Sequence, residues 1–217
     1  MAVKNRAFVR PDDLRRGTPR TVRSQVTRAA LLDAAARVVG RHGYAEASIA
    51  RITEYAGVAQ GTFYNYFGSR QELLDQILPN LSDEMLEFIR KRVAEISDPV
   101  EREREQFQAF FAYLVERPEF FRVLHEAEQF APQAYRQHHS KVEEGYLRWF
   151  KRLQGTGVLS RFTDAELKVV AEILMGARDY IAMLYSLSNG EKAKPVPEHV
   201  VTSYMKLISG GLFSKPA

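Results

Sequence analysis

Apolar residues recur along most of this 217-residue chain at the three- and four-residue spacing of amphipathic helices. Glycines, prolines and helix-capping residues divide that pattern into segments of helical length. No stretch alternates between apolar and polar residues for long enough to predict a β-strand. We therefore predict an all-α fold of about nine helices, three of them near the N-terminus.

Local signals mark the ends of the first three predicted helices. The first is expected to end at Gly43, because glycine takes the left-handed conformation of a helix cap without steric cost. The second begins after Ser48, whose side chain can accept a hydrogen bond from a free backbone N–H, and it ends at Gly57. The third spans residues 60–67 and is too short to be stable without packing.

The second and third predicted helices form a helix-turn-helix, a unit that places its second helix in the major groove of DNA. Phe63 and Phe67 are expected to anchor the third helix, which leaves its polar and aromatic side chains for DNA. We predict contacts to base edges from Gln60, Thr62 and Asn65, because amide and hydroxyl groups can read them. The other predicted DNA-binding residues, mostly phosphate contacts, are Arg23, Ser48, Gly61, Tyr64, Tyr66 and Arg70.

The net charge of +4 is unevenly distributed along the chain. Residues 1–70 hold 12 Lys and Arg against 5 Asp and Glu, whereas residues 71–217 hold 19 against 22. A basic excess beside the helix-turn-helix suits the neutralisation of phosphates, although basic N-terminal tails are often merely solvated. Residues 1–23 lack hydrophobic periodicity, so we predict a flexible basic arm there and a DNA-binding domain at 24–70.

The stretch GVAQGTFYNYFGSRQELL resembles the signature of the tetracycline-repressor-like (TetR) family of transcriptional regulators. The upstream stretch TRAALLDAAARVVGRHGYAEASIARI is similar to the first two helices of that family. Three positions depart from its usual pattern: Ala59 replaces a capping Ser or Thr, Asn65 a frequent His, and Gly68 a frequent Lys. The resemblance implies an N-terminal three-helix DNA-binding domain followed by a helical ligand-binding and dimerisation domain at residues 71–217.

Beyond residue 74 the apolar spacing predicts a further series of helices. Pro79 lies within the fourth helix and is expected to kink or break it. Asp98 is expected to cap the fifth helix, and Thr163 to open the eighth with a capping box. The eighth should end near Asn189, and Pro197 should start the ninth.

Most aromatic residues fall in residues 71–217, which suits either an ordinary core or an apolar ligand pocket. The resemblance implies an effector cavity among the fourth to eighth helices, and the aromatic content favours a hydrophobic or aromatic effector. The candidate effector-binding residues are Phe88, Phe107, Phe111, Leu114, Phe121, His125, Gln129, Tyr146, Trp149, Phe150, Met175 and Asp179.

Arg178 and Asp179 interrupt an apolar stretch of the eighth predicted helix, where unpaired charge is costly. They are expected either to pair across a dimer interface or to contact the effector. The eighth and ninth predicted helices carry more apolar surface than one flank can cover. The resemblance implies that these helices form a four-helix interface between two copies of the chain, which suits the two-fold reading of palindromic DNA.

The sequence contains no convincing catalytic or metal-binding constellation. His138 and His139 are adjacent and therefore point apart on a helix, and only His139 shares a face with Glu143. No nucleophile motif, phosphate-binding glycine loop or cysteine is present. We predict that the chain is not an enzyme and uses no metal or cofactor. The lack of a signal peptide or a long apolar run predicts a cytoplasmic location without a membrane partner.

These observations predict a homodimeric repressor that binds a palindromic DNA operator and is released by a small effector. The alternative is a DNA-binding regulator of the same fold without a small-molecule effector, controlled by a protein partner or acting as an activator. The helix-turn-helix and the charge distribution support DNA binding in both cases, so the two hypotheses differ only in the role of residues 71–217.

Overall fold

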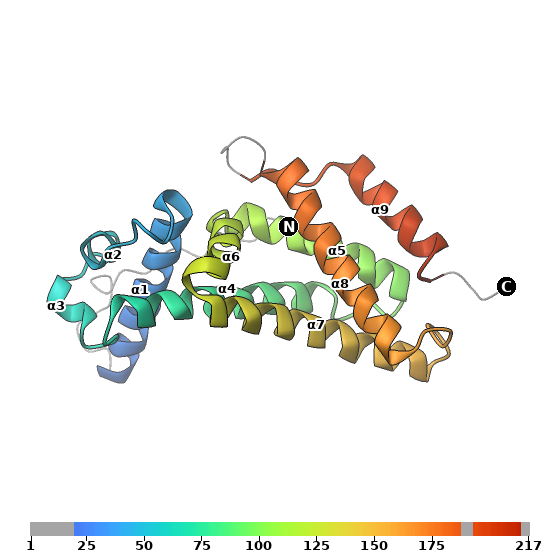
Figure 1. The fold of residues 1–217 in the computed structure, drawn as a ribbon, viewed down its shortest axis with the longest axis horizontal. Helices are drawn as coiled ribbons and strands as arrows, with labels where there is room; N and C mark the ends of the chain where they lie inside the picture. Colours follow the sequence, from blue (N-terminus) through green and yellow to red (C-terminus); the bar gives the residue numbers. More distant parts are fainter. Residues whose placement is uncertain (1–19, 188–192, 214–217) are drawn as a thin grey trace. The chain divides into compact units, whose positions relative to one another are not determined.

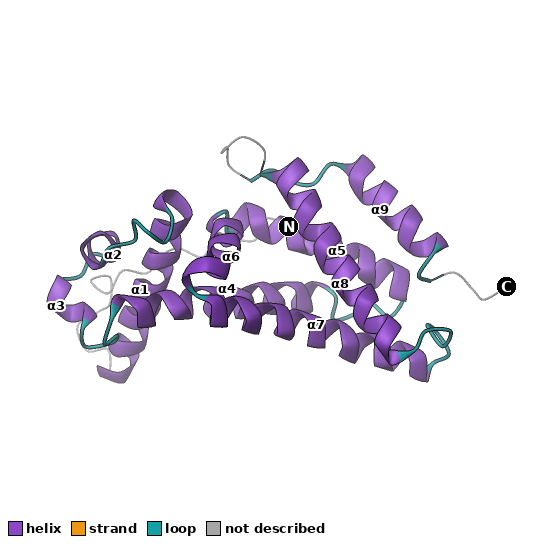
Figure 2. Cartoon of the chain, in the orientation of Figure 1, coloured by secondary structure: helices purple, strands orange, loops and turns teal. Residues whose placement is uncertain are grey.

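The computed structural model describes residues 20–187 and 193–213. These residues form helices joined by short turns, and no β-strand occurs among them (Figures 1 and 2). The all-α prediction is therefore confirmed. The helical elements are α1 (Arg20–His42), α2 (Ile49–Ala56), α3 (Gln60–Phe63), α4 (Arg70–Arg92), α5 (Pro99–Glu116), α6 (Glu119–Phe130), α7 (Pro132–Gly155), α8 (Asp164–Ile181), the π-helical turn η2 (Ala182–Ser186) and α9 (Glu198–Gly210).

The chain divides into two compact units. The head unit takes in the described residues up to Ser82 together with Glu119–His138. The body unit takes in Asp83–Pro118 together with the described residues from His139 onward. The head unit thus contains α6 in addition to the three helices predicted for the DNA-binding domain.

The first and third helices differ in length from the prediction. α1 begins at Arg20, so residues 20–23 are helical rather than part of a flexible arm, and the rest of that predicted arm lies outside the described residues. α3 ends at Phe63, and residues 64–66 form a turn closed by a hydrogen bond from the Tyr66 N–H to the Phe63 carbonyl at 2.9 Å. An uncapped helix this short gains little from a further turn, so the backbone tightens instead.

The remaining helix ends follow the predicted signals with two exceptions. α4 continues through Pro79 to Arg92, so the proline does not break it. Leu78 and Leu81 on either side are fully buried, and this packing compensates for the missing backbone hydrogen bond. α8 gives way at Ala182 to η2, while the predicted end near Asn189 lies outside the described residues.

The core of the head unit consists of the apolar faces that the helical spacing predicted. Its buried side chains in α1, α2 and α3 include Leu31, Leu32, Ala35, Val38, Val39, Ile52, Ala56 and Phe63. Tyr44 follows α1 and is fully buried, with its ring stacked on Phe130 of α6 at a centroid distance of 5.8 Å. Burial of each large side chain stabilises the fold by about 1.5–3 kcal/mol, which secures helices that are too short to persist alone.

The core of the body unit is dominated by aromatic rings. Phe107 of α5 stacks on Tyr204 of α9 at 4.1 Å between centroids, and its ring also contacts Phe111 at 4.8 Å. In α7, Trp149 and Phe150 lie 5.4 Å apart and are buried. The second half of the described chain therefore uses its aromatic residues to pack helices against one another.

Candidate DNA-binding surface and effector region

The turn between α2 and α3 is set by two capping interactions. Ser48 caps α2 as predicted, its hydroxyl accepting a hydrogen bond from the Arg51 backbone N–H at 3.3 Å. At the other end, Gly57 has a φ of +70°, in the left-handed region that favours glycine, and its N–H donates to the Glu54 carbonyl at 3.1 Å. The direction in which α3 leaves α2 is therefore fixed by local backbone geometry.

Two phenylalanines hold α3 and the following turn against the head unit. Phe63 and Phe67 are buried, and their ring centroids lie 5.6 Å apart. Ala59 provides no side-chain cap, as its residue type predicted. The predicted DNA-contacting residues of this segment are exposed or partly exposed, namely Gln60, Gly61, Thr62, Tyr64, Asn65 and Tyr66. They are accessible, while the two buried phenylalanines hold the segment in place. We call these six residues the recognition turn.

Gly61 is unusual within the recognition turn because nothing in the chain requires glycine there. A Cβ atom at this position would meet no heavy atom within 4 Å. The positive φ angles of the described glycines belong to Gly43, Gly57 and Gly157, not to Gly61. The space beside this backbone is therefore open to an external partner.

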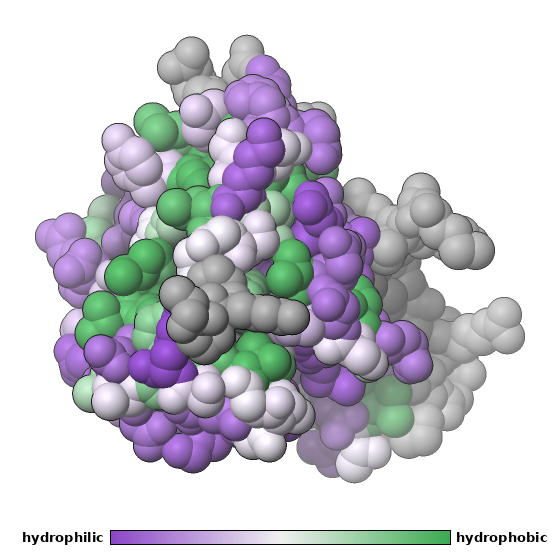
Figure 3. Space-filling model, turned by 90° about the vertical axis from the view of Figure 1, so that its right-hand side faces the viewer, coloured by the Kyte–Doolittle hydropathy of each residue, from purple (hydrophilic) through white to green (hydrophobic). Residues whose placement is uncertain are grey.

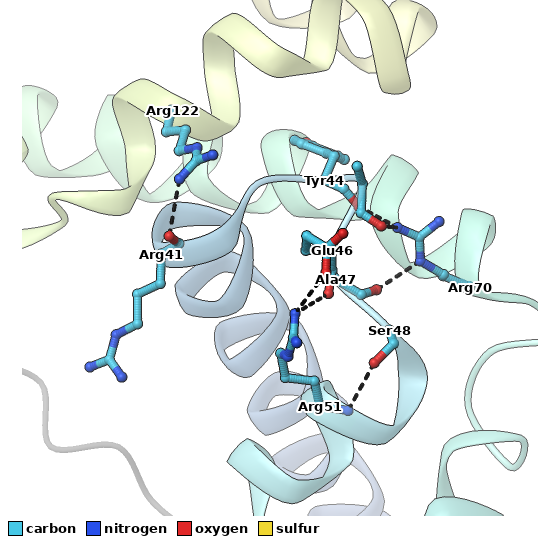
Figure 4. A network of polar contacts seen from close by, with 9 residues as sticks. Arg41, Tyr44, Glu46, Ala47, Ser48, Arg51, Arg70 and Arg122 are labelled. Carbon is cyan, nitrogen blue, oxygen red and sulfur yellow. Dashed lines mark hydrogen bonds and ion pairs between the residues drawn. The ribbon is translucent and has the colours of Figure 1, made fainter.

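Arg70, a predicted phosphate contact, is used within the head unit. Its Nε donates to the Ala47 carbonyl at 2.7 Å, and its Nη2 donates to the carbonyls of Ala45, at 3.2 Å, and Tyr44 (Figure 4). These bonds tie the start of α4 to the loop between α1 and α2. A cation at the start of a helix is disfavoured by the helix dipole, and this was the sequence signal that Arg70 has other partners.

Arg23 and Ser48, the other predicted contacts outside the recognition turn, are exposed. Arg23 lies in the first turn of α1, where its carbonyl accepts a hydrogen bond from the Thr27 hydroxyl at 2.9 Å. The Ser48 hydroxyl accepts one bond from the chain, and its own proton remains a potential donor to a phosphate. Both side chains are therefore accessible to an external partner.

Sequence reasoning missed a polar contact that fastens α6 to the end of α1. Glu126 accepts hydrogen bonds from the Tyr44 backbone N–H at 2.7 Å and from Arg122 Nε at 2.6 Å. Arg122 also donates to the Arg41 carbonyl at 3.1 Å, near the C-terminal end of α1 (Figure 4). We call Arg122, Glu126 and these two backbone groups the α6 latch.

The glycine that ends α1 lies against the α6 latch. Gly43 has a φ of +84°, and a Cβ on it would lie 2.8 Å from Arg122 Nη2 and 2.9 Å from Glu126 Oε2. The left-handed conformation at this glycine was predictable from the chain pattern. Its closeness to the side chains of α6 was not, because α6 lies about 80 residues further along the chain.

The candidate effector-binding residues fall into both units. The body unit holds Phe88, Phe107, Phe111, Leu114, Tyr146, Trp149, Phe150, Met175 and Asp179, and the head unit holds Phe121, His125 and Gln129. Within the head unit, the His125 ring lies 4.0 Å from the Phe121 ring, and His125 Nδ1 is 2.8 Å from the Phe121 carbonyl oxygen. His125 and Gln129 are exposed. Within each unit, the aromatic members already contact other rings.

The body unit contains a buried polar cluster that the sequence had only half revealed. Glu103 Oε1 accepts hydrogen bonds from Arg178 Nη2 and from the Tyr204 hydroxyl, both at 2.6 Å. Burial raises the pKa of Glu103 above its ordinary value, while Arg178 and Tyr204 act in the opposite direction. Arg178 therefore pairs with a carboxylate of its own chain, a partner that neither of the two expectations for it had named.

Glu103 itself had a detectable signal. It precedes Phe107 by one helical turn and so lies on the buried face of α5. An acidic residue on such a face needs a partner, just as Arg178 does on α8. The sequence did not indicate that the two residues, 75 positions apart, were each other's partner.

His138, a candidate that the sequence had set aside, is buried in the head unit. Its Nδ1 lies 2.6 Å from the Ser82 hydroxyl, which donates to the Leu78 carbonyl at 2.7 Å. Because the serine hydroxyl donates to the carbonyl, it accepts from the histidine, whose Nδ1 then carries the proton. This pair joins α7 to α4 within the head unit and is an internal contact.

Comparison with known proteins identifies the N-terminal part of the chain. Residues 31–77 match the family described as "Bacterial regulatory proteins, tetR family". An uncharacterized HTH-type transcriptional regulator, YvdT of Bacillus subtilis, is 43% identical over 63 residues, which cover 29% of this chain and 32% of that protein. The sequence likeness thus spans about a third of that curated relative.

Solved structures extend the likeness in fold to nearly the whole chain. The fatty acid degradation regulator FadR of Bacillus halodurans has a TM-score of 0.73 and 19% identity, covering 93% of this chain and 100% of that one. AibR, solved with isovaleryl coenzyme A and operator DNA, has a TM-score of 0.63 and 21% identity, covering 86% and 98%. At these identities the likeness shows a shared fold.

No helix among the described residues is long and apolar enough to cross a membrane.

The relatives are transcriptional regulators rather than enzymes. The sequence match lies over the helix-turn-helix, and the fold match extends from that domain through the C-terminal helices. Residues 31–77 are therefore similar to the tetR family of bacterial regulatory proteins, and beyond them the likeness is one of fold.

Proposed function

We propose that the chain acts as a homodimeric repressor that reads a palindromic operator and is released by a small hydrophobic or aromatic effector. Residues 24–70 would read DNA, while residues 71–217 would bind the effector and form the dimer. The observation that supports DNA binding most directly is the recognition turn. Its polar side chains are exposed or partly exposed, and two buried phenylalanines hold this segment in place. Such a surface binds DNA without first ordering the backbone that presents it.

Five of the six residues of the recognition turn have distinct proposed tasks. Gln60, Thr62 and Asn65 offer amide and hydroxyl groups to base edges in the major groove. Tyr64, whose side chain is 61% exposed, donates to a phosphate and sets the register on the duplex. The open space beside Gly61 lets the DNA approach the backbone of α3 closely.

Exposed apolar side chains on α8, η2 and α9 support a dimer. Large hydrophobic residues remain at the surface in this part of the body unit, including Val169, Ile173, Tyr180, Met183, Leu184, Tyr185 and Leu207. Ile173 is 61% exposed and Leu207 is 73% exposed. Figure 3 shows hydrophobic residues reaching the surface among hydrophilic ones on the face it displays. Apolar surface of this extent commonly marks an interface, and a second copy of the chain brings a second recognition turn.

The aromatic body unit and the fold neighbours support the effector. AibR shares the fold and was solved with isovaleryl coenzyme A, and FadR is a fatty acid degradation regulator. Aromatic side chains such as those of Phe107, Tyr146 and Trp149 are the usual walls of sites for apolar ligands. An effector would release DNA only if it bound a dimer with the wrong spacing of its recognition turns more tightly.

One observation favours the second candidate, a regulator of this fold without a small-molecule effector. The aromatic rings of the body unit already pack against each other, as Phe107 does against Tyr204 and Phe111. A core whose aromatic rings already pack closely against one another needs no bound ligand to fill it. Control would then come from a protein partner, or the protein would act as an activator.

Operator selection from random duplex DNA, followed by binding of Tyr64→Ala and Asn65→Ala, tests the proposed DNA reading. Tyr64→Ala should weaken binding on every sequence, because it removes a phosphate contact. Asn65→Ala should cost about 1–3 kcal/mol on the selected operator and relax the preference at particular base pairs. If both variants bind operator and random DNA as the unmodified protein does, the recognition turn is not the reading element.

A thermal-shift screen with medium-chain fatty acids, acyl coenzyme A esters and aromatic acids tests the effector. A ligand at 100 times its dissociation constant stabilises the folded state by about 2.7 kcal/mol, a shift that such a screen detects readily. The positive compound should also release operator DNA. If none of these compounds stabilises the protein while operator binding is intact, the regulator without an effector is the better description.

A further inference from the structure

A single carboxylate oxygen in the body unit bonds to two helices that carry the exposed apolar surface. Glu103 Oε1 accepts from Arg178 Nη2, which belongs to α8, and from the hydroxyl of Tyr204, which belongs to α9. Glu103 is fully buried, and Arg178 and Tyr204 are 7% and 6% exposed. This oxygen therefore links α5 to both α8 and α9.

We propose that Glu103 is the positioning residue for dimerisation: it fixes α8 and α9 relative to α5, and thereby sets the geometry of the face on which a second copy docks. This inference rests on the proposed homodimer. α9, which bears the exposed Leu207, packs on α5, and so does η2, which continues α8.

Aromatic contacts hold the two donors in place. The Arg178 guanidinium lies over the Tyr146 ring at 5.2 Å and over the Phe107 ring at 6.0 Å from each centroid. Tyr204 stacks on the same Phe107 ring. Guanidinium and hydroxyl can therefore reach Oε1 from only a narrow range of helix positions.

Directional bonds are needed here because the surrounding contacts are not directional. Hydrophobic attraction scales with buried area and tolerates small shifts of one helix along another. A buried charged hydrogen bond is lost when either helix slides or rotates, so it specifies register, the best-attested role of buried polar groups. Dimer docking requires such register because the exposed residues of α8 and α9 must meet the partner together.

The cluster of Glu103, Arg178 and Tyr204 leaves polar atoms without partners, so stability alone does not explain it, and this supports a positioning role. Glu103 Oε2 and Arg178 Nε are buried without a hydrogen-bond partner. A partly satisfied buried network stabilises a fold less than apolar residues of the same shape, and replacing a buried ion pair by such residues is often neutral or stabilising. We therefore expect this cluster to specify how α8 and α9 are positioned on α5 rather than to add stability.

The test replaces the cluster and measures dimerisation separately from folding. The triple variant Glu103→Leu, Arg178→Met, Tyr204→Phe removes both charges and the hydroxyl at similar volume. The milder Tyr204→Phe breaks only the link to α9. Tyr44→Phe is the matched control, because it removes a buried tyrosine hydroxyl in the head unit without touching the bonds to Glu103. Analytical ultracentrifugation gives the dimer dissociation constant, and circular dichroism gives helix content and the unfolding midpoint.

We expect the triple variant to keep its helix content and to raise the dimer dissociation constant about tenfold or more. Tyr204→Phe should raise it about threefold to tenfold, and the control should leave it unchanged. If Tyr204→Phe and a folded triple variant both dimerise as the unmodified protein does, Glu103 does not position the interface. Should the triple variant unfold, Tyr204→Phe decides alone. If the unmodified protein is itself a monomer at all concentrations, the proposed homodimer fails instead.

Discussion

At the scale of single residues, Gly61 differs from the glycines that the backbone conformation of the fold requires. The glycines at positions 43 and 57 have positive φ angles, so the backbone explains them. Gly61 has neither a positive φ nor a neighbour within 4 Å of a Cβ. No contact among the described residues therefore requires glycine at position 61, and the proposed approach of DNA offers a reason for it.

Gly61→Ala should separate stability from DNA binding. Alanine is favoured over glycine in a helix by about 0.8–1.0 kcal/mol, so the unfolding free energy should rise by up to that amount. Operator affinity should fall, because the added methyl group occupies the space where the DNA would lie. Urea denaturation and fluorescence anisotropy measure the two effects. Unchanged operator affinity would remove Gly61 from the proposed contact surface.

Glu103 predicts a pH dependence of stability. Because burial raises its pKa above the ordinary value of 4.5, the folded chain binds this proton more tightly than the unfolded chain. The contribution of Glu103 to the unfolding free energy is then greatest below about pH 4.5 and declines as the pH rises through the folded-state pKa.

Chemical denaturation at several pH values compares the unmodified protein with Glu103→Gln, which cannot titrate. The unfolding free energy of the unmodified protein, relative to that of the variant, should decrease as the pH rises from about 4.5. Other titrating groups cancel in this difference because both proteins share them. A difference that stays constant with pH, or that grows, would contradict the raised pKa.

At the scale of elements, α6 is attached to the end of α1 and to the following loop through the latch. The Tyr44 N–H is satisfied by Glu126, and Arg122 bonds to the last turn of α1. On the other side of the same loop, Arg70 of α4 bonds to three carbonyls between Tyr44 and Ala47. The loop that precedes α2 is therefore held by two helices that lie outside the helix-turn-helix.

Glu126→Ala should lower the unfolding free energy by about 1–3 kcal/mol, because it leaves the backbone N–H of Tyr44 without its acceptor. It should also weaken operator binding, since the loop that supports α2 loses one of its two attachments. Glu128→Ala is the control, an exposed glutamate on the same helix. Urea denaturation and operator titration read out the two effects, and equal behaviour of both variants would assign no role to the latch.

At the scale of the whole molecule, charge and apolar surface have separate locations along the chain. The basic excess belongs to residues 1–70, and the exposed apolar residues of α8, η2 and α9 belong to the body unit. Since Arg70 is used internally, the proposed phosphate binding depends more on the other basic residues. Five of these lie within residues 1–19.

Deletion of residues 1–19 should therefore reduce the salt dependence of operator binding. The slope of log affinity against log salt should fall in magnitude by about 0.9 for each phosphate that the deleted cations neutralise. Affinity at low salt should fall, while the base preference of the recognition turn should be retained. Gel-shift titrations over a range of salt concentrations measure the slope. An unchanged slope would mean that the deleted cations bind no phosphate in the complex.

Sequence alone determined the helical architecture and the location of the helix-turn-helix. Helical spacing, caps and left-handed glycines are local signals, because each acts within one or two turns of its own helix. For this reason the caps at Ser48, Asp98 and Thr163 were all predicted and are present. The sequence also identified Arg178 as a charge that needs a partner.

Only the tertiary structure decided which distant groups satisfy one another. Arg70 turned out to bond to the carbonyls before α2, Glu126 to the N–H of Tyr44, and Arg178 to Glu103. Each pairing joins residues more than 20 positions apart, and many acceptors in a chain of this length are chemically equivalent. Local pattern shows that a buried charge must be paired, whereas the choice of partner follows from how the helices pack.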